Sequence, residues 1–143
     1  MTENEIGAIV VDASIAVHRA LGPPGLLESV YVIALAHELE RRSLQLDRQV
    51  PIAIRYSGIT FSPGFRADIV VERKVILEIK SVEQTTAAHR KQIQTYLRLS
   101  GYKLGFLLNF GDALMKNGIT RAVKDLDEPS VASPAATRPE RHR

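Results

Sequence analysis

The apolar positions near the N-terminus recur every three or four residues, which is the spacing of one face of an α-helix. They follow Thr2 and Glu5, a pair typical of a helix capping box, and are Ile6, Ile9, Val10, Ala13, Ala16, Val17 and Ala20. Two prolines between two glycines, residues 22–25, end this first helix. A second helix is predicted from about residue 26 to residue 42. The chain therefore begins with two helices.

After residue 44 the apolar positions alternate, and β-branched residues become common, as in strands. Strands are predicted near residues 46–56, 65–71 and 74–80, a third helix near 86–100, a buried strand near 103–110 and a last edge strand near 117–123. This order predicts the α/β fold class, with a central mixed sheet flanked by helices and two helices at the N-terminus.

The length of 143 residues is that of one domain. We expect residues 1–126 to form this domain. Residues 127–143 hold three of the seven prolines and show no apolar periodicity. We therefore expect a disordered C-terminal tail.

The composition narrows the possible chemistry. The chain has no cysteine, which excludes disulfides, thiolate zinc sites, iron–sulfur clusters and a cysteine nucleophile. Any metal must then be held by oxygen or imidazole ligands. The net charge of +3 suits a polyanionic partner. No stretch has the pattern of a signal peptide or a membrane span, so we expect a cytoplasmic protein.

The most informative segment is residues 65–80, which predicts a hairpin of two strands. If its turn centres on Arg73, Asp68 lies directly opposite Glu78. Side chains that face each other on an antiparallel ladder have Cβ atoms about 4.5–5.5 Å apart. Lys80 lies two residues beyond Glu78 and therefore on the same face of its strand.

Two carboxylates at this separation repel each other, and a divalent cation between them reverses the effect. Mg²⁺ prefers hard oxygen ligands. We therefore predict that Mg²⁺ or Mn²⁺ binds Asp68 and Glu78, with the Ile79 carbonyl as an additional ligand. Lys80 could orient or deprotonate a water molecule, or offset charge that develops on a phosphate.

Spacing alone also fits a solvent-facing hairpin whose polar residues happen to be Asp, Glu and Lys. The neighbouring residues argue against this alternative, because Val70 and Ile76 share the same faces as the charged side chains. Charged groups among branched aliphatic residues indicate a partly buried site.

Asp68, followed about ten residues later by Glu78-Ile79-Lys80, resembles the Asp…Glu-x-Lys signature of PD-(D/E)XK nucleases. Over roughly residues 5–123 the chain also resembles the small bacterial GxxExxY proteins of that superfamily, in the segments 25–31, 89–97 and 101–110. Ala67 stands where the signature often has proline. The resemblance implies a restriction-endonuclease-like core.

The resemblance also implies further site residues. It carries onto Glu28 the role of a first-helix glutamate that approaches the metal, although an exposed residue or a structural ion pair remains an alternative. Gln92 and Tyr96 match a Gln-x-x-x-Tyr element that lines the site, and Gln92 could hydrogen-bond a phosphate or a water molecule. Three basic residues could contact nucleic-acid phosphates, although an ordinary charged surface explains them equally well: Arg66, Arg90 and Lys91.

The leading hypothesis is a Mg²⁺-dependent nuclease that acts on DNA or RNA. One alternative is a module of the same fold that binds nucleic acid, or supports assembly, without cleaving. Another is a metal-dependent enzyme for a different phosphorylated molecule. A homodimer is an open alternative to a monomer.

Overall fold

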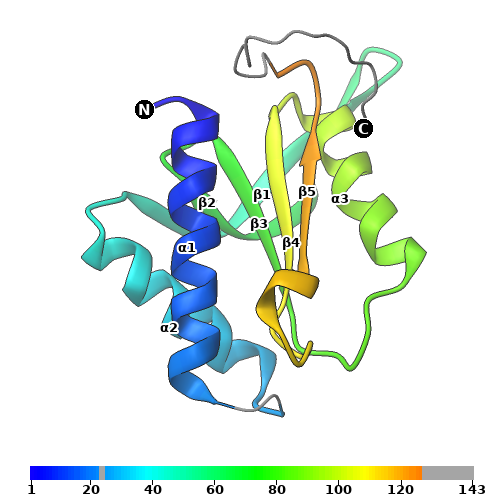
Figure 1. The fold of residues 1–143 in the computed structure, drawn as a ribbon. Coiled ribbons are helices and arrows are strands. Elements are labelled where there is room, and N and C mark those ends of the chain that lie inside the picture. The colour runs from blue at the N-terminus through cyan, green and yellow to red at the C-terminus, as the bar shows by residue number, and fades with distance from the viewer. Residues whose placement is uncertain (23–24, 127–143) are drawn as a thin grey trace, which may run out of the picture.

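A five-stranded sheet separates two layers of helices in the computed structural model (Figure 1). The structure describes residues 1–22 and 25–126, so the predicted tail 127–143 lies outside the described residues. The elements in chain order are α1 (Glu3–Leu21), α2 (Glu28–Arg41), β1 (Leu46–Tyr56), β2 (Ile59–Val71), β3 (Val75–Lys80), α3 (Ala87–Ser100), β4 (Leu104–Asn109), the short 3₁₀ helix η1 (Met115–Asn117) and β5 (Ile119–Val123).

The strands follow their chain order across the sheet, β1-β2-β3-β4-β5. Neighbouring strands are antiparallel except for β3 and β4, which are parallel. A parallel pair needs a crossover connection, and α3 supplies it. Helices α1 and α2 pack on one face of the sheet, while α3 packs on the other (Figure 1). The predicted mixed sheet with flanking helices is confirmed.

Side-chain caps fix the starts of two helices. Thr2 and Glu5 form the predicted capping box at α1. At α3, Thr86 accepts a hydrogen bond from the His89 backbone, and the His89 ring accepts one from the Thr86 N–H. His89 therefore has a structural role here. None of the described helices is long and apolar enough to span a membrane.

The hairpin between β2 and β3 has the predicted register. Val71 pairs with Val75, which centres the turn on Arg73. The adjoining hairpin differs from the prediction, because β2 begins at Ile59 rather than near residue 65. A Ser57-Gly58 turn pairs Tyr56 with Ile59. The added segment is exposed and contains Pro63 and Gly64. Its sequence therefore lacks the alternation that marks a half-buried strand.

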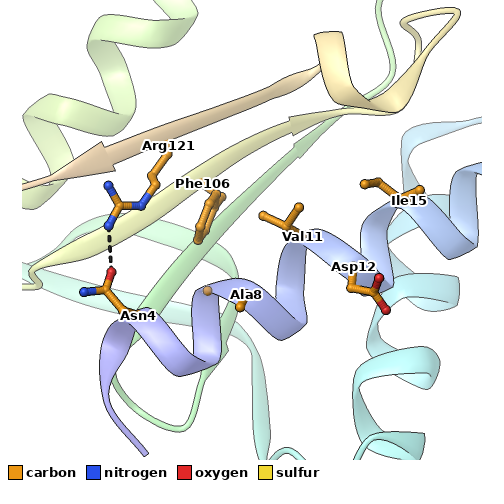
Figure 2. A pocket seen from close by; sticks show the side chains of 8 residues that line it. Asn4, Ala8, Val11, Asp12, Ile15, Phe106 and Arg121 are labelled. Carbon is orange, nitrogen blue, oxygen red and sulfur yellow. Dashed lines mark hydrogen bonds between the residues drawn. The ribbon is translucent and has the colours of Figure 1, made fainter. Parts of the chain in front are cut away.

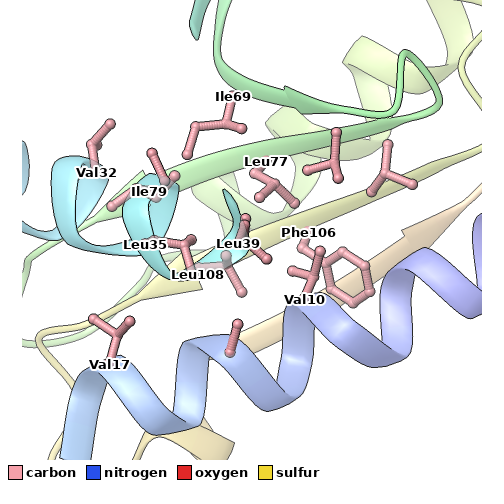
Figure 3. Packing of buried hydrophobic residues seen from close by; sticks show 14 of the residues in the cluster. Val10, Val17, Val32, Leu35, Leu39, Ile69, Leu77, Ile79, Phe106 and Leu108 are labelled. Atoms are coloured by element: carbon pink, nitrogen blue, oxygen red, sulfur yellow. The ribbon is translucent and has the colours of Figure 1, made fainter. Parts of the chain in front are cut away.

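Two hydrophobic clusters hold the layers together, one on each face of the sheet. Figure 3 shows the cluster between the sheet and helices α1 and α2, which includes Val10, Leu35, Leu39, Ile69, Leu77 and Phe106. The cluster on the α3 side includes Val70, Ile76, Ile93, Leu97 and Leu107. Burial of each such side chain contributes roughly 1.5–3 kcal/mol. Val70 and Ile76 thus assign one face of β2 and β3 to the α3 side.

Candidate metal centre

Asp68 and Glu78 meet where β2 and β3 stop pairing. The last paired residues in this direction are Ile69 and Leu77, and the next step along both strands brings Asp68 opposite Glu78. By strand alternation both carboxylates project toward α3, as Val70 and Ile76 do. Glu78 is buried, with 8% of its surface exposed, and Asp68 is half-buried. The structure therefore brings these two predicted residues together.

The Asp68 side chain replaces a backbone acceptor at this point. The Ile79 N–H donates a hydrogen bond to Asp68 Oδ2 over 2.8 Å. In a regular ladder that N–H would bond to a carbonyl of β2. The Ile79 carbonyl also points toward β2, because the N–H and C=O of one residue face the same neighbouring strand. Asp68 is thus fixed against β3 by one oxygen. The Ile79 carbonyl lies on the same side of β3 as Asp68.

Without a cation, Asp68 and Glu78 do not both ionise readily. Burial, and then the negative charge of Asp68, raise the pKa of Glu78 to about 8. Burial also raises the pKa of Asp68, while the hydrogen bond from Ile79 and the charge of Lys80 act in the opposite direction. Within the described residues Glu78 Oε1 is buried and has no hydrogen-bond partner. A buried polar atom without a partner destabilises the fold by about 1–3 kcal/mol.

These residues fit a divalent cation that prefers oxygen ligands. The unpartnered Glu78 oxygen lies beside a second carboxylate, and both are hard donors of the kind that Mg²⁺ and Mn²⁺ bind. Among the described residues no group of three His, Cys, Asp or Glu could hold a metal ion. The site therefore offers two carboxylates, with the Ile79 carbonyl as a backbone candidate on the Asp68 side.

Lys80, the last residue of β3, brings positive charge to the same end of this strand. Its half-buried side chain follows Glu78 by two residues, and its charge lowers the pKa of both carboxyls from the values that burial sets. Its backbone carbonyl accepts a hydrogen bond from the Phe110 N–H over 2.9 Å, which fixes the end of β3 to β4. The predicted Asp, Glu and Lys set is therefore assembled at one end of the sheet.

Helix α3 contributes Tyr96 and Gln92. Burial, and then the negative charges of Glu78 and Asp68, raise the pKa of Tyr96, while a hydrogen bond with Gln92 acts in the opposite direction. The Tyr96 ring stacks on Phe65, with ring centroids 3.7 Å apart and an interplanar angle of 5°. The structure thus places this helical pair beside the two carboxylates.

Glu28 approaches the site from the opposite layer. It is the first residue of α2 and is exposed, so it needs no buried partner. Its negative charge still raises the pKa of Glu78. A hydrogen bond of 2.7 Å from Ser81 Oγ to the Leu26 carbonyl fixes the start of α2 to the segment after Lys80. Glu28 is close enough to act on Glu78 by its charge, but it does not complete a three-ligand group.

The three predicted phosphate contacts are exposed. The Arg66 guanidinium donates to the Gln49 carbonyl, and the Arg90 guanidinium donates to the Thr85 carbonyl and hydroxyl oxygens. Lys91 lies on the first turns of α3. The structure leaves all three side chains accessible, and two of them also bond to the protein itself.

A separate groove of about 470 Å³ lies between α1 and the strands β4 and β5 (Figure 2). Phe106 and aliphatic side chains of α1 form most of its wall. The carboxylate at its margin, Asp12, forms an ion pair with Arg42. Two other polar residues that line the groove, Asn4 and Arg121, hydrogen-bond to each other (Figure 2).

Comparison with known proteins identifies the class. A family model of the PD-(D/E)XK nuclease superfamily matches residues 4–122, and the chain belongs to that superfamily. The predicted superfamily and its fold are thus confirmed. A solved structure described as "Crystal structure of SSO0001" is similar, with 20% identity and a TM-score of 0.49, over 69% of this chain. The chain spans half the length of that protein. No curated protein matches.

Sequence reasoning gave no role to two residues that the structure places beside Lys80. Ser81 fixes the start of α2, and Asn109 bonds to the segment that leaves β3. The signal available for Asn109 was a polar amide at the end of an apolar run, and the structure shows that it is fully buried. Ser81 carried no such signal, because its partner is 55 residues away.

Proposed function

We propose that this chain is a divalent-metal-dependent nuclease that hydrolyses phosphodiester bonds of DNA or RNA. The carboxylates of Asp68 and Glu78, with the Ile79 carbonyl, hold Mg²⁺ or Mn²⁺. One observation carries the proposal: Glu78 is buried beside a second carboxylate, with an oxygen that has no partner within the described residues. A cation satisfies that oxygen and offsets the negative charge that both carboxylates carry once Glu78 has lost its proton.

When bound, such a cation makes a water molecule more acidic and stabilises negative charge on a phosphate. The protein's own groups provide the rest. The Lys80 ammonium lies on the same face as Glu78, where it orients the attacking water or offsets charge on the phosphate oxygens. Because Lys80 is half-buried, its charge acts in a medium less polarisable than water and is screened less.

Two further residues complete the proposed catalytic set. Gln92 bonds to Tyr96 and can hydrogen-bond a phosphate oxygen or a water molecule. Glu28 adds negative charge from the other layer and, as an exposed carboxylate, can accept a proton from solvent or from a water molecule. Both are proposed to act on the reacting groups rather than to bind the metal.

The substrate is proposed to lie beside α3, at the end of the sheet where β2 and β3 separate. Tyr96 borders the carboxylates, and Arg66, Arg90 and Lys91 are accessible to a polyanion. We assign these four residues to nucleic-acid binding. Cleavage of both strands of a duplex would need two such sites, so a homodimer is the assembly to seek if duplex DNA is the substrate.

The test is a cleavage panel with single-stranded and double-stranded DNA and RNA, each with Mg²⁺, Mn²⁺, Ca²⁺ or a chelator. The matched control is Asp68→Asn, purified in the same way, which retains an oxygen for the Ile79 N–H. Cleavage by the wild type that needs Mg²⁺ or Mn²⁺ and is lost in the control supports the proposal. Equal cleavage by the two proteins would reveal a contaminating nuclease.

The same panel decides between the alternatives. Nucleic-acid binding without cleavage under any condition would favour a non-cleaving module on this fold. Metal-dependent hydrolysis of a generic phosphodiester such as bis-p-nitrophenyl phosphate, without attack on any nucleic acid, would favour an enzyme for another phosphorylated molecule. Either result would contradict the proposed nuclease activity.

A further inference from the structure

Asn109, at the end of β4, is fully buried, and its side chain makes four hydrogen bonds. Oδ1 accepts from the Val82 N–H over 3.0 Å and from the Gly111 N–H over 3.1 Å. Nδ2 donates to the Val82 carbonyl over 2.9 Å and to Asp112 Oδ2 over 2.8 Å. Both donors and both acceptor sites of the amide are thus in use.

These bonds continue the sheet after its backbone ladder ends. Lys80 and Asn109 are partners in the β3–β4 register, and the Phe110 N–H donates to the Lys80 carbonyl. One step later the Asn109 amide bonds to both the N–H and the carbonyl of Val82, as a strand would. The segment that follows Lys80 therefore remains attached to β4 through one side chain.

Asn109 also lies on the face of the sheet that carries the proposed site. Partners in a parallel register project to the same side, and the preceding pair on that side is Glu78 with Leu107. The contact with the exit of β3 is close, because a Cβ added to Gly111 would lie 1.9 Å from the Val82 carbonyl oxygen. A side chain at position 111 would therefore collide with the segment that leaves β3.

We infer that Asn109 is a positioning residue for Lys80, an inference that rests on the proposed nuclease function. The amide fixes Val82, and Val82 fixes the direction in which β3 leaves the sheet, with Lys80 at its last position. Asp68 has the corresponding place on the other side of β3, where it holds Ile79. Lys80 thus lies on a short segment that side chains hold from both neighbouring strands.

The variant that tests this is Asn109→Asp, which keeps the shape and removes both N–H donors. It places a carboxylate opposite the Val82 carbonyl and Asp112, so the segment after Lys80 should move away. We expect kcat to fall about tenfold or more, because small misplacements of a catalytic group have effects of this size. Mn²⁺ affinity should remain unchanged. Asn117→Asp, at an exposed asparagine, is the control.

A second measurement does not need catalysis. The six lysines can be reductively methylated with ¹³C-formaldehyde, and the Lys80 resonance assigned with Lys80→Arg. In Asn109→Asp the Lys80 methyl signal should shift while the other five remain in place. Asp112→Ala, which removes one acceptor of the Asn109 amide, is a milder variant for use if Asn109→Asp does not fold, and should shift the same signal.

The outcomes separate this inference from the function on which it rests. An unshifted Lys80 signal in Asn109→Asp overturns the positioning role. If the wild type cleaves, an unchanged kcat in Asn109→Asp also overturns it. Shifts of all six lysine signals, together with a lower melting temperature, also overturn it, because they indicate a general structural effect. If the wild type never cleaves, the proposed function fails, while the NMR result still decides whether Asn109 positions Lys80.

Discussion

Asp68 accepts a hydrogen bond from the Ile79 N–H, and this bond fixes the carboxylate at the point where β2 and β3 separate. One oxygen of Asp68 is therefore occupied by the protein and the other is available to a ligand. The opposite residue, Glu78, has a buried oxygen with no partner in the described part of the chain. The two carboxylates thus have different tasks: Asp68 is held in place, and Glu78 is the group that a cation would satisfy.

Asp68→Asn should lower Mn²⁺ affinity by about tenfold or more, because it removes a charged ligand but retains an acceptor for the Ile79 N–H. Titration calorimetry on both proteins measures this directly. Asp47→Asn, an exposed carboxylate on β1, is the matched control and should bind Mn²⁺ as the wild type does. Equal affinity in Asp68→Asn and wild type would show that Asp68 is not a ligand.

The metal-free protein should lose stability as the pH rises from about 4.5 to about 8. The folded-state pKa of Glu78 is raised from 4.5 to about 8, so in this window the folded protein binds a proton that the unfolded chain has released. The free energy of unfolding then decreases with pH. Urea denaturation in the presence of a chelator, repeated at several pH values, measures the slope.

Glu78→Gln tests the origin of that slope, because glutamine does not titrate. The variant should show a flatter dependence of unfolding free energy on pH, with a difference from the wild type that changes by roughly 5 kcal/mol across the window, at about 1.4 kcal/mol per pKa unit. Glu83→Gln, at an exposed position, is the control and should keep the slope of the wild type. Parallel curves for Glu78→Gln and wild type would contradict the raised pKa.

Lys80→Met should separate catalysis from metal binding. Methionine retains most of the stem and removes the ammonium, so Mn²⁺ affinity should stay the same or increase slightly. Cleavage should fall about 10²–10³-fold, the usual effect of removing one group that stabilises the transition state. Lys116→Met, at an exposed lysine of η1, is the control. Wild-type cleavage by Lys80→Met would remove Lys80 from the catalytic set.

Tyr96→Phe should leave the melting temperature nearly unchanged, since the ring and its stacking on Phe65 remain. If the hydroxyl contacts nucleic acid as proposed, KM should rise about fivefold, in line with the loss of about one hydrogen bond, while kcat stays constant. Tyr56→Phe, at an exposed tyrosine near the tip of the β1–β2 hairpin, is the control. A loss of kcat at constant KM would indicate a role in the reaction instead.

The hairpin that carries the site could be predicted because its pattern is local. Only one turn centre places Asp68 opposite Glu78, and the aliphatic neighbours Val70 and Ile76 indicated burial on that face. Helix caps and strand alternation are also local, which is why most elements lie within a few residues of their predicted ranges. The first half of β2 was not predicted, because its exposed residues do not alternate.

The remaining features depend on contacts between distant segments, which no local pattern encodes. The resemblance assigned Glu28 to the site, but its exposure depends on where α2 begins. Glu28 is the first residue of that helix and is exposed, and a hydrogen bond from Ser81 to the Leu26 carbonyl holds the helix start. Asn109 is joined to Val82 by the parallel pairing of β3 and β4. Parallel pairing through a crossover cannot be read from either strand alone.

The burial of Glu78 also determines how metal uptake exchanges protons with solvent. Below about pH 8 this carboxyl carries a proton in the metal-free protein, and a cation has to displace it. Binding near neutral pH should therefore release about one proton, and the measured heat should vary with the ionisation enthalpy of the buffer. At a pH well above 8 the release should vanish and the heat should become the same in every buffer.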